Sequence, residues 1–442
     1  MSGKSTMIDA WERVLERRSD DIALIEAEQK RSYRFHELNH LAEVWIERLA
    51  GKRLARKSVI VHLPNSADWI ALLIALRRVN AVVIPVDYSW PLQKVEEVTE
   101  RFRAALIITS SGIRECDLPH RKWKEGCSLV KLTSGSTGVP KGIVFSDDEL
   151  IADGYNIIET MGISGGDRNL CLHPLGHSYA IGNVVVPLLA FGISVVMGSS
   201  PFPRVIQEEA AAFGATVLPT VPPILEALCK AGVESLRPIR LVISAAAPLT
   251  PVLATTFFDK FGFYIHNFYG SSETGGITYD RTGKSGLSGE AIGTPLANVR
   301  LRISKHGHLL VQSMAISHYG KPTDRDNPAE EMLSDRASIA LDGSITLQGR
   351  ADRVEKIGGK RIDLAAMEDA LAETFSTSHV AIFKAENAIQ VVMENGKFEE
   401  QEVKCWLSRR LGRRYQLRLV SKVPLTSRGK KDYVALKARF SK

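Results

Sequence analysis

Along the first two thirds of the chain, the spacing of hydrophobic positions alternates between a helical and a strand-like period. Residues 35–49 and 67–76 repeat apolar side chains at helical spacing, while residues 59–63 and 81–86 form short, mostly apolar runs typical of buried strands. Similar runs return at residues 193–197, 215–218 and 241–243. Strands that alternate with helices predict an α/β fold with largely parallel sheets, covered by helices on both faces.

After Ile292 the pattern changes to short strand-like runs separated by turn glycines, at residues 299–303, 308–312 and 344–348. Such closely spaced strands predict a small β-barrel. From Gly349 the composition becomes strongly charged, and a compact α+β segment is expected from there onward. The chain contains no internal repeat or low-complexity tract.

A loop dense in glycines and hydroxyls occupies residues 133–142, between the strand-like runs 128–132 and 143–145. Its hydrogen-bonding members are Thr133, Ser134, Gly135, Ser136, Thr137, Gly138 and Lys141. Glycines let backbone N–H groups turn toward an anion, and a lysine adds charge, as a polyphosphate requires. A surface linker is the alternative, but a loop that joins two strands favours phosphate binding. The Walker A pattern does not fit, because no Ser or Thr follows the lysine.

A second polar tract follows the strand-like run 263–266. It contains Asn267, Tyr269, Gly270, Ser271, Ser272, Glu273, Thr274 and Gly275. A polar turn is the simplest interpretation. A carboxylate beside hydroxyls also supplies the oxygen ligands that Mg²⁺ shares with phosphates.

Three shorter segments carry residues that are unremarkable in isolation. Asp335 precedes a strand pair, as many turn residues do. Gly358-Gly359 is compatible with a hairpin turn, and Lys430 lies in a basic tail where a lysine is normally solvated.

Taken in order, these segments resemble the adenylate-forming enzymes: acyl-CoA synthetases, aryl-acid ligases, luciferases and peptide-synthetase adenylation domains. The resemblance runs from residue 32 to residue 431. It implies an α/β fold with a large N-terminal domain of two α/β sheets plus a small β-barrel, residues 1–350. A small mobile α+β domain, residues 351–442, would follow. The chain is short for the family near residues 110–131 and 320–335 and in its last domain, which we interpret as trimmed loops.

The resemblance also implies residue roles. The loop from Thr133 to Lys141 would bind phosphates, Tyr269 would stack on adenine, Glu273 would hold Mg²⁺ and Thr274 would contact the α-phosphate. Ala246 and Ala247 would join the nucleotide site, Asp335 would bond the ribose hydroxyls and Arg350 would reach the ribose or phosphate. Asp352 matches the hinge, and Lys356, Gly358 and Gly359 match the thiol channel. Lys430 matches the catalytic lysine, whose cation offsets the repulsion between carboxylate and phosphate; its neighbour Lys431 is the alternative.

The expected acid pocket includes His177, Ser178, Ile181, Ala245 and Gly275. A histidine beside an apolar run can also be a hydrogen-bonded core residue. Amino-acid-activating relatives carry Phe-Asp where this chain has Gly176-His177, so an α-amino acid is disfavoured. Fatty and aryl acids both stay open, although Ala245, where many relatives have glycine, favours a slim or flat acid.

Charge is unevenly distributed: residues 401–442 carry a net charge of +11 and the remaining chain −4. A solvated helix face or a phosphate-bearing or acidic partner would explain the basic tail, and no nucleic-acid-binding motif accompanies it. The five cysteines are scattered, so neither disulfides nor structural zinc is expected. Apolar runs fall short of the ~18 residues of a membrane helix, and no signal sequence is evident, which predicts a cytoplasmic protein.

We therefore expect an ATP- and Mg²⁺-dependent ligase that activates a small carboxylic acid as an acyl-adenylate. The acyl group would then pass to a thiol, with CoA favoured over the phosphopantetheine arm of an acyl carrier protein. A catalytically decayed nucleotide-binding protein is the second alternative, weakened because Glu273 and Lys430 are both present.

Overall fold

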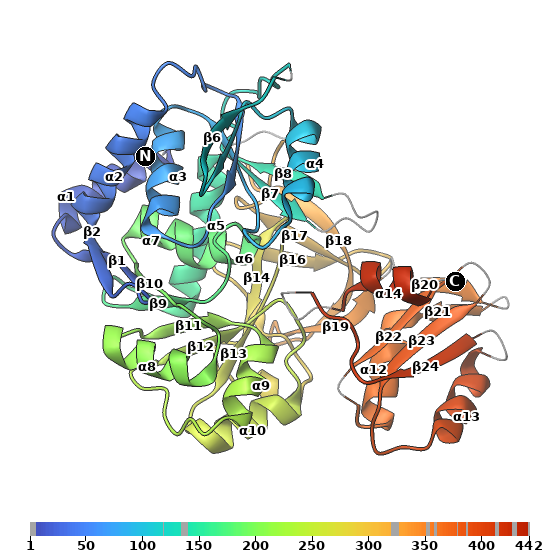
Figure 1. Cartoon of the computed structure of the whole chain (residues 1–442). Coiled ribbons are helices and arrows are strands. Elements are labelled where there is room, and N and C mark those ends of the chain that lie inside the picture. Colours follow the sequence, from blue (N-terminus) through green and yellow to red (C-terminus); the bar gives the residue numbers. More distant parts are fainter. Residues whose placement is uncertain are drawn as a thin grey trace. The chain divides into compact units, whose positions relative to one another are not determined.

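The structure is a computed structural model of the 442-residue chain (Figure 1). It describes residues 6–117, 119–133, 140–319, 327–350, 354–357, 360–377, 379–385, 388–411, 415–426 and 431–440. The chain divides into two compact units, residues 1–301 with 311–331 and residues 302–310 with 332–442. Because the expected hinge at Asp352 lies outside the described residues, a domain boundary after residue 350 stays a prediction.

The larger sheet of the first unit has nine strands in the order β15-β14-β13-β12-β11-β9-β10-β1-β2. Its members are β1 (Ile22–Glu26), β2 (Arg31–Arg34), β9 (Arg168–Cys171), β10 (Ser194–Met197), β11 (Val217–Thr220), β12 (Leu241–Ser244), β13 (Ile265–Ser271), β14 (Gly275–Tyr279) and β15 (Thr294–Pro295). The strands from β13 to β1 pair in parallel, and β2, β14 and β15 are antiparallel at the edges. The strands predicted at 193–197, 215–218 and 241–243 are confirmed as β10, β11 and β12.

The second sheet of this unit has six strands in the order β6-β5-β3-β4-β7-β8. They are β3 (Ser58–His62), β4 (Val82–Pro85), β5 (Leu106–Thr109), β6 (Gly112–Glu115), β7 (Leu129–Thr133) and β8 (Lys141–Phe145). Strands β5, β3, β4 and β7 are parallel, with β6 and β8 antiparallel at the edges.

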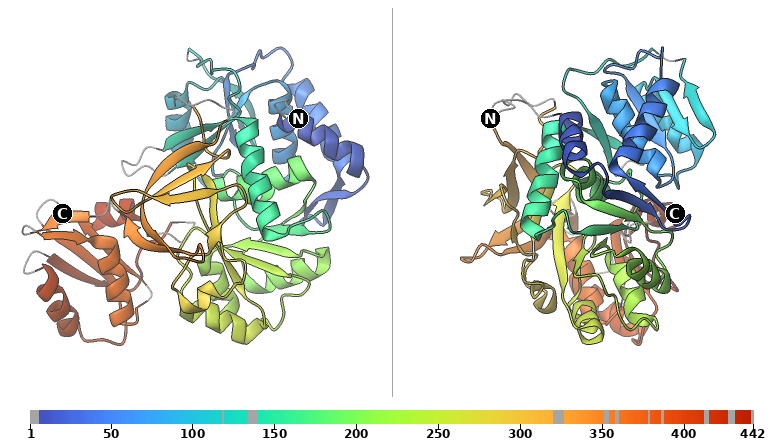
Figure 2. Two further views of the ribbon diagram at one scale, coloured as in Figure 1. Left: turned by 180° about the vertical axis from the view of Figure 1, so that it is seen from behind. Right: turned by 90° about the vertical axis from the view of Figure 1, so that its left-hand side faces the viewer.

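One hydrophobic core joins the two sheets. It contains Val59 and Val83 from the six-stranded sheet together with Leu24 and Val195 from the nine-stranded sheet. Helices α1 (Met7–Arg18), α2 (Phe35–Arg48), α3 (Ala67–Arg78), α5 (Asp147–Met161) and α7 (Val186–Phe191) contribute to the same core. Helix α1 packs against α7, and α2 packs against α3 (Figures 1 and 2). The helices predicted at residues 35–49 and 67–76 are thus confirmed.

The outer faces of both sheets are also covered. Ile60 of β3 packs with residues of α4 (Leu92–Phe102), and Val242 of β12 packs with residues of α8 (Pro203–Phe213), α9 (Pro222–Lys230) and α10 (Pro251–Phe261). Ile60 and Val59 face opposite sides because successive residues of a strand alternate. Both faces of each sheet are buried, as the apolar runs predict. Three short helical segments complete the unit: α6 (Ser178–Ala180), the π-helical η1 (Ile181–Val185) and α11 (Ser285–Ser288).

The strands expected after Ile292 form a four-stranded sheet in the order β16-β17-β18-β19. These are β16 (Arg300–Ile303), β17 (His308–Ser313), β18 (Ala329–Ile339) and β19 (Ile345–Arg350). Closure of this sheet into a barrel stays a prediction.

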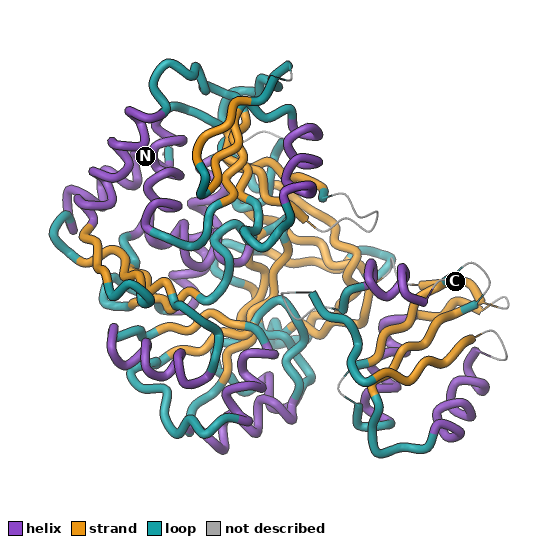
Figure 3. Tube along the Cα trace, viewed as in Figure 1, coloured by secondary structure: helices purple, strands orange, loops and turns teal. Residues whose placement is uncertain are grey.

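The C-terminal segment is α+β, as expected from its composition (Figure 3). It contains the hairpin β20 (Val354–Ile357) and β21 (Lys360–Asp363), then α12 (Leu364–Thr374), β22 (Val380–Lys384), β23 (Ile389–Glu394), α13 (Glu400–Leu411), β24 (Tyr415–Val420) and α14 (Tyr433–Phe440). Strands β22, β23 and β24 form one sheet, and Leu371, Val391 and Leu407 are among the residues of the hydrophobic core beside it.

Candidate functional site

Strands β7 and β8 form an antiparallel hairpin whose last residue pair is Thr133 and Lys141. The hydroxyl of Thr133 lies 3.5 Å from the carbonyl oxygen of Lys141. The predicted phosphate loop therefore connects two paired strands, as the apolar runs on either side of it indicate. Its members Ser134, Gly135, Ser136, Thr137 and Gly138 lie outside the described residues, so their contact with phosphate stays a prediction.

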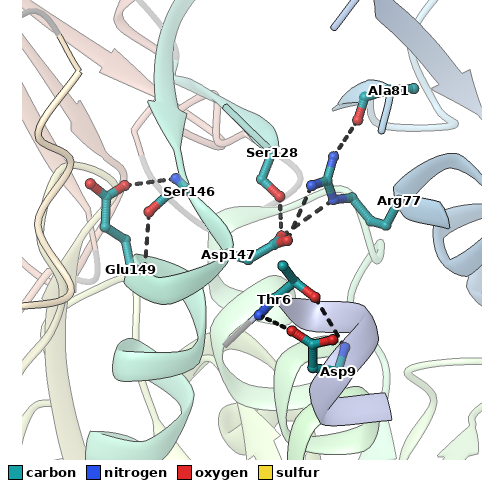
Figure 4. Close-up of polar contacts among 8 residues, drawn as sticks. All are labelled: Thr6, Asp9, Arg77, Ala81, Ser128, Ser146, Asp147 and Glu149. Atoms are coloured by element: carbon teal, nitrogen blue, oxygen red, sulfur yellow. Dashed lines mark hydrogen bonds and ion pairs between the residues drawn. The ribbon is translucent and has the colours of Figure 1, made fainter. Parts of the chain in front are cut away.

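A buried ion pair anchors the base of this hairpin (Figure 4). Arg77 Nη2 of α3 lies 3.1 Å from Asp147 Oδ2 at the start of α5, and the two side chains are 9% and 10% exposed. The hydroxyl of Ser128, directly before β7, also donates to Asp147, and Arg77 donates to the Ala81 carbonyl. Ser128 directly precedes β7, and Asp147 follows β8 as the first residue of α5. Their hydrogen bond therefore links the two ends of the hairpin.

The helix that begins here is capped by reciprocal hydrogen bonds. The Ser146 N–H donates to Glu149 Oε2 at 2.8 Å, and the Glu149 N–H donates to the Ser146 hydroxyl at 3.3 Å (Figure 4). The other oxygen of Glu149 accepts the backbone N–H of His318 at 2.8 Å. Glu149 therefore also holds the loop after β17 against α5. Thr6 and Asp9 form the same kind of cap on α1.

The tract from Asn267 to Gly275 runs through β13 into a tight turn that leads to β14. The hydroxyl of Ser271 accepts the N–H groups of Glu273 and Thr274, each at 3.2 Å, and lies 3.1 Å from the Thr274 hydroxyl. Thr274 is buried and Glu273 is half-buried. A polar turn is thus the correct local description, and hydrogen bonds to Ser271 fix the backbone that carries the candidate Mg²⁺ ligand Glu273.

Two glycines make this turn possible. Gly275 has a φ of +74°, and a Cβ at Gly270 would lie 2.7 Å from the Gly275 carbonyl oxygen. Asn267, Tyr269 and Gly270 lie on β13, and Ser272 lies in the turn itself. Their contacts with a nucleotide stay predictions.

A buried carboxylate connects this turn to the hairpin. Asp153 Oδ2 of α5 lies 3.6 Å from Lys131 Nζ of β7, and the two side chains are 4% and 1% exposed. Asp153 Oδ1 accepts the backbone N–H of Gly276 at 2.8 Å. The strand that enters the phosphate loop and the strand that leaves the Glu273–Thr274 turn therefore meet at one side chain.

At the expected acid pocket, His177 is buried and its Nε2 lies 2.6 Å from Asp87 Oδ2. Burial by itself would raise the pKa of Asp87, but hydrogen bonds from His177 and Ser89 outweigh it and hold that pKa well below its usual range. His177 thus makes the hydrogen bond expected of a core histidine, and its contact with a substrate stays a prediction.

Other predicted pocket residues lie on segments that follow β9 and β12 of the nine-stranded sheet. Ser178 begins α6 and Ile181 begins the π-helical turn η1. Ala245 and Ile181 are buried, and Ala245, Ala246 and Ala247 follow β12 directly. In open α/β sheets, ligands bind outside the carboxyl ends of the strands, which agrees with this placement.

The sequence motifs do not contain Asp87, Lys131 or Asp153. A signal existed for Lys131, because a lysine inside the apolar run 128–132 must be paired if that run is buried. Asp153 carried no comparable signal, since an acidic residue on an amphipathic helix is normally solvated.

In the second unit, the expectation that Asp335 precedes a strand pair is wrong, because it lies within β18, directly opposite Arg350 of β19. This register places the two predicted ribose-binding positions side by side. Lys356 lies on β20, while Asp352, Gly358, Gly359 and Lys430 lie outside the described residues.

Lys431, the neighbour of the predicted catalytic lysine, is engaged elsewhere. Its Nζ lies 2.6 Å from Glu368 Oε2, and the hydroxyl of Tyr433 donates to Glu368 Oε1 at 2.7 Å. Lys431 also pairs with Leu425 in an antiparallel bridge, and the Asp432 N–H donates to the Pro424 carbonyl at 2.9 Å. The ends of the segment that carries Lys430 are therefore fixed in the fold.

No group of three or more His, Cys, Asp or Glu side chains in the described part of the chain could hold a metal ion by itself. A single carboxylate such as Glu273 suits Mg²⁺, which keeps waters and is shared with substrate phosphates. Among the described residues, no helix is both long and apolar enough to span a membrane.

Comparison with known proteins agrees with these motifs. The family model "AMP-binding enzyme" matches residues 11–131 and 117–312. A dimodular nonribosomal peptide synthase from Bacillus subtilis is 22% identical over 393 residues, covering 76% of this chain and 16% of the synthase. A p-hydroxybenzoic acid–AMP ligase from Mycobacterium tuberculosis is 26% identical over 369 residues, covering 73% of this chain and 51% of the ligase. The chain thus spans about half or less of these relatives' length.

The fold is also found among solved structures. The o-succinylbenzoate CoA synthetase (MenE) from Bacillus subtilis, in complex with its acyl-adenylate intermediate, superposes with a TM-score of 0.82 at 16% identity and covers 99% of both chains. The large α/β unit, the small α+β segment and the match of the family model over most of the chain lead to one assignment: this chain belongs to the AMP-binding enzymes, the adenylate-forming superfamily.

Proposed function

We propose that this protein is an ATP- and Mg²⁺-dependent ligase that joins a carboxylic acid to a thiol. The acid attacks the α-phosphate of ATP, which forms an acyl-adenylate and releases pyrophosphate. The thiol then attacks the acyl carbon and AMP leaves, so that each step breaks one bond to the leaving group and forms one to the nucleophile.

One observation carries this proposal. The strand that enters the phosphate loop and the turn with Glu273 and Thr274 are joined through Asp153 in one compact unit. The strand that leads into the predicted phosphate loop and the turn with the candidate Mg²⁺ ligand are therefore supported by the same buried carboxylate. Mg²⁺, when bound, would neutralise charge on the phosphates. Glu273 would hold the ion, and Lys430 would supply the cation between acid and α-phosphate.

For the acid we propose an aryl or fatty acid. The p-hydroxybenzoic acid–AMP ligase supports an aryl acid. An α-amino acid is disfavoured because His177, hydrogen-bonded to Asp87, takes the place of the aspartate that pairs with an ammonium in amino-acid-activating relatives.

For the thiol we propose coenzyme A, since the chain shares the fold of a CoA synthetase. Loading of a carrier protein is the alternative, and it is supported by the similarity to a nonribosomal peptide synthase.

ATP–pyrophosphate exchange, screened over aryl, fatty and amino acids, tests the first step. Exchange that depends on an aryl or fatty acid is the expected result. Thioester formation from the best acid, with CoA in one arm and a phosphopantetheinylated carrier in the other, tests the second step. Exchange with none of the acids would favour a decayed nucleotide-binding protein.

A further inference from the structure

Asp153 lies in the middle of α5 at a point where three segments of the first unit converge, and it belongs to none of the sequence motifs. Its carboxylate pairs with Lys131 of β7 and accepts the N–H of Gly276 of β14. The third neighbour is Gly182 of the turn η1, where a Cβ would lie 2.9 Å from Asp153 Oδ2.

Each of these segments leads directly to a predicted part of the active site. Lys131 lies two residues before Thr133, where the phosphate loop begins. Gly276 follows the turn that carries Glu273 and Thr274, and Gly182 follows Ile181 of the acid pocket. The contacts are close on every side, since a Cβ at Gly275 would lie 2.2 Å from Asp153 Oδ1.

The charges are enclosed. Lys131 is 1% exposed and its ammonium also lies 4.4 Å from the centre of the Phe145 ring. A lysine buried to this degree in an apolar strand is costly unless it is paired. Hydrophobic residues of similar volume often replace a buried ion pair without loss of stability. A buried pair that joins three site segments is therefore better explained by positioning than by stability alone.

We infer that Asp153 is a positioning residue, whose hydrogen bond to Gly276 holds the Glu273–Thr274 turn in register with the strand that enters the phosphate loop. Lys131 neutralises the carboxylate and fixes its orientation. This inference rests on the proposed function only for the identity of the ligand, which is Mg²⁺-ATP.

Two double variants separate positioning from stability. Lys131→Met with Asp153→Asn removes both charges but keeps an oxygen that can accept the Gly276 N–H. Lys131→Met with Asp153→Leu removes both charges and the acceptor and keeps the same branched arrangement of heavy atoms, although the two methyl groups are larger than the atoms they replace. A third double variant, Arg240→Met with Asp167→Asn, disrupts another ion pair of the same unit, in which Arg240 Nη2 lies 2.6 Å from Asp167 Oδ2.

Binding of Mg²⁺-ATP is measured by titration calorimetry, together with urea unfolding of each variant and acid-dependent pyrophosphate exchange. We expect the Asn double variant to bind ATP nearly as the wild type does. The Leu double variant should lose about 10- to 100-fold in ATP affinity and in kcat/KM for exchange, the scale for small displacements of a reacting group. The Arg240–Asp167 variant should be less stable than the wild type but bind Mg²⁺-ATP with unchanged affinity. It therefore measures how much a loss of stability alone affects ATP binding.

Equal ATP affinity in the Asn and Leu double variants would overturn the inference. It would also be overturned if the Leu double variant and the Arg240–Asp167 control were equally destabilised and lost ATP affinity to the same extent. If no acid supports exchange in the wild type but the affinity pattern holds, the proposed function fails and the inference stands. A wild type that does not bind ATP would overturn both.

Discussion

Lys431 and Glu368 form an ion pair in the second unit, with 2.6 Å between Nζ and Oε2 and with the glutamate side chain 3% exposed. Glu368 also accepts the Ile382 N–H and the Tyr433 hydroxyl. Of the two adjacent lysines, Lys431 is therefore committed to the fold, which strengthens the assignment of catalysis to Lys430.

Lys430→Ala should lower adenylation by a factor of roughly 10² or more, because one charge contact is lost in the transition state. Thioester formation from supplied acyl-adenylate should survive. Lys431→Met should instead lower the free energy of unfolding by about 1–3 kcal/mol, since a buried acceptor loses its donor, with a far smaller effect on adenylation. Exchange kinetics and urea unfolding of both variants check this. The opposite pattern would move the catalytic role to Lys431.

The predicted hinge makes a separate prediction. Asp352→Pro should leave pyrophosphate exchange intact but abolish most thioester production, because proline restricts φ and would impede the domain rotation that we predict after adenylation. Asp352→Ala is the control and should retain both half-reactions. Equal loss of both half-reactions in the proline variant would argue against a two-conformation cycle.

The lowered pKa of Asp167 predicts how the free energy of unfolding changes at acidic pH. Burial alone would raise the pKa of Asp167, but hydrogen bonds from Arg240, the Ser164 N–H and Thr216 lower it to about 2. Its folded pKa lies below the unfolded value of about 4, so its contribution to stability is present above about pH 4 and is lost as the pH falls toward 2. Asp167→Asn should therefore be less stable than the wild type at pH 7, with the difference shrinking between pH 4 and pH 2. Urea unfolding over that range measures it, and a constant difference would contradict the prediction.

The buried hydroxyl of Tyr179 leads to a prediction about the free energy of unfolding. Complete burial raises the pKa of Tyr179; the Thr220 backbone lies close enough to counter part of that rise, yet no described atom completes a hydrogen bond of normal geometry with the hydroxyl. Tyr179→Phe should leave the free energy of unfolding unchanged or raise it by up to about 1 kcal/mol.

Tyr33→Phe is the matched control, because the Tyr33 hydroxyl donates to Glu26 at 3.2 Å. It should lose about 1 kcal/mol of stability. Thermal or urea unfolding distinguishes the two variants. A clear loss in Tyr179→Phe would show that its hydroxyl is satisfied in the native protein.

The basic end of α13 allows a test of whether the acyl acceptor is a carrier protein or CoA. Arg409 and Arg410 are exposed, and the Arg410 guanidinium lies 3.6 Å from the centre of the Trp406 ring; Arg413 and Arg414 lie outside the described residues. If a carrier protein is the acceptor, reversing all four arginines to glutamate should raise the apparent KM for the carrier at least about tenfold and leave adenylation unchanged. The effect on KM should weaken at high salt, because salt screens the attraction between exposed charges, over a length of about 10 Å at 0.1 M. Reversing the charges of Lys30 and Arg31 in the first unit is the control for a change of net charge, although it alters two residues in place of four. An unchanged KM for the carrier in both variants would favour CoA as the acceptor.

Much of this protein follows from sequence alone, because the physical signals are local. Helical spacing at residues 35–49 and buried strands at 59–63 and 193–197 depend only on which side chains avoid water. The prediction that residues 133–142 join two strands is confirmed by β7 and β8, since the flanking apolar runs are themselves a local signal of buried strands.

The tertiary structure alone decided which distant residues share a contact. Asp153 meets Gly276 across 123 positions of sequence, and Asp87 meets His177 across 90. No local pattern encodes such pairs, because an isolated acidic residue on a helix or in a loop is normally solvated. Its role is set only when packing removes water and leaves one charge or N–H group as its partner. The sequence determined the elements and the motifs, and the packing of α5 against β7 and β14 decided how the motifs are held together.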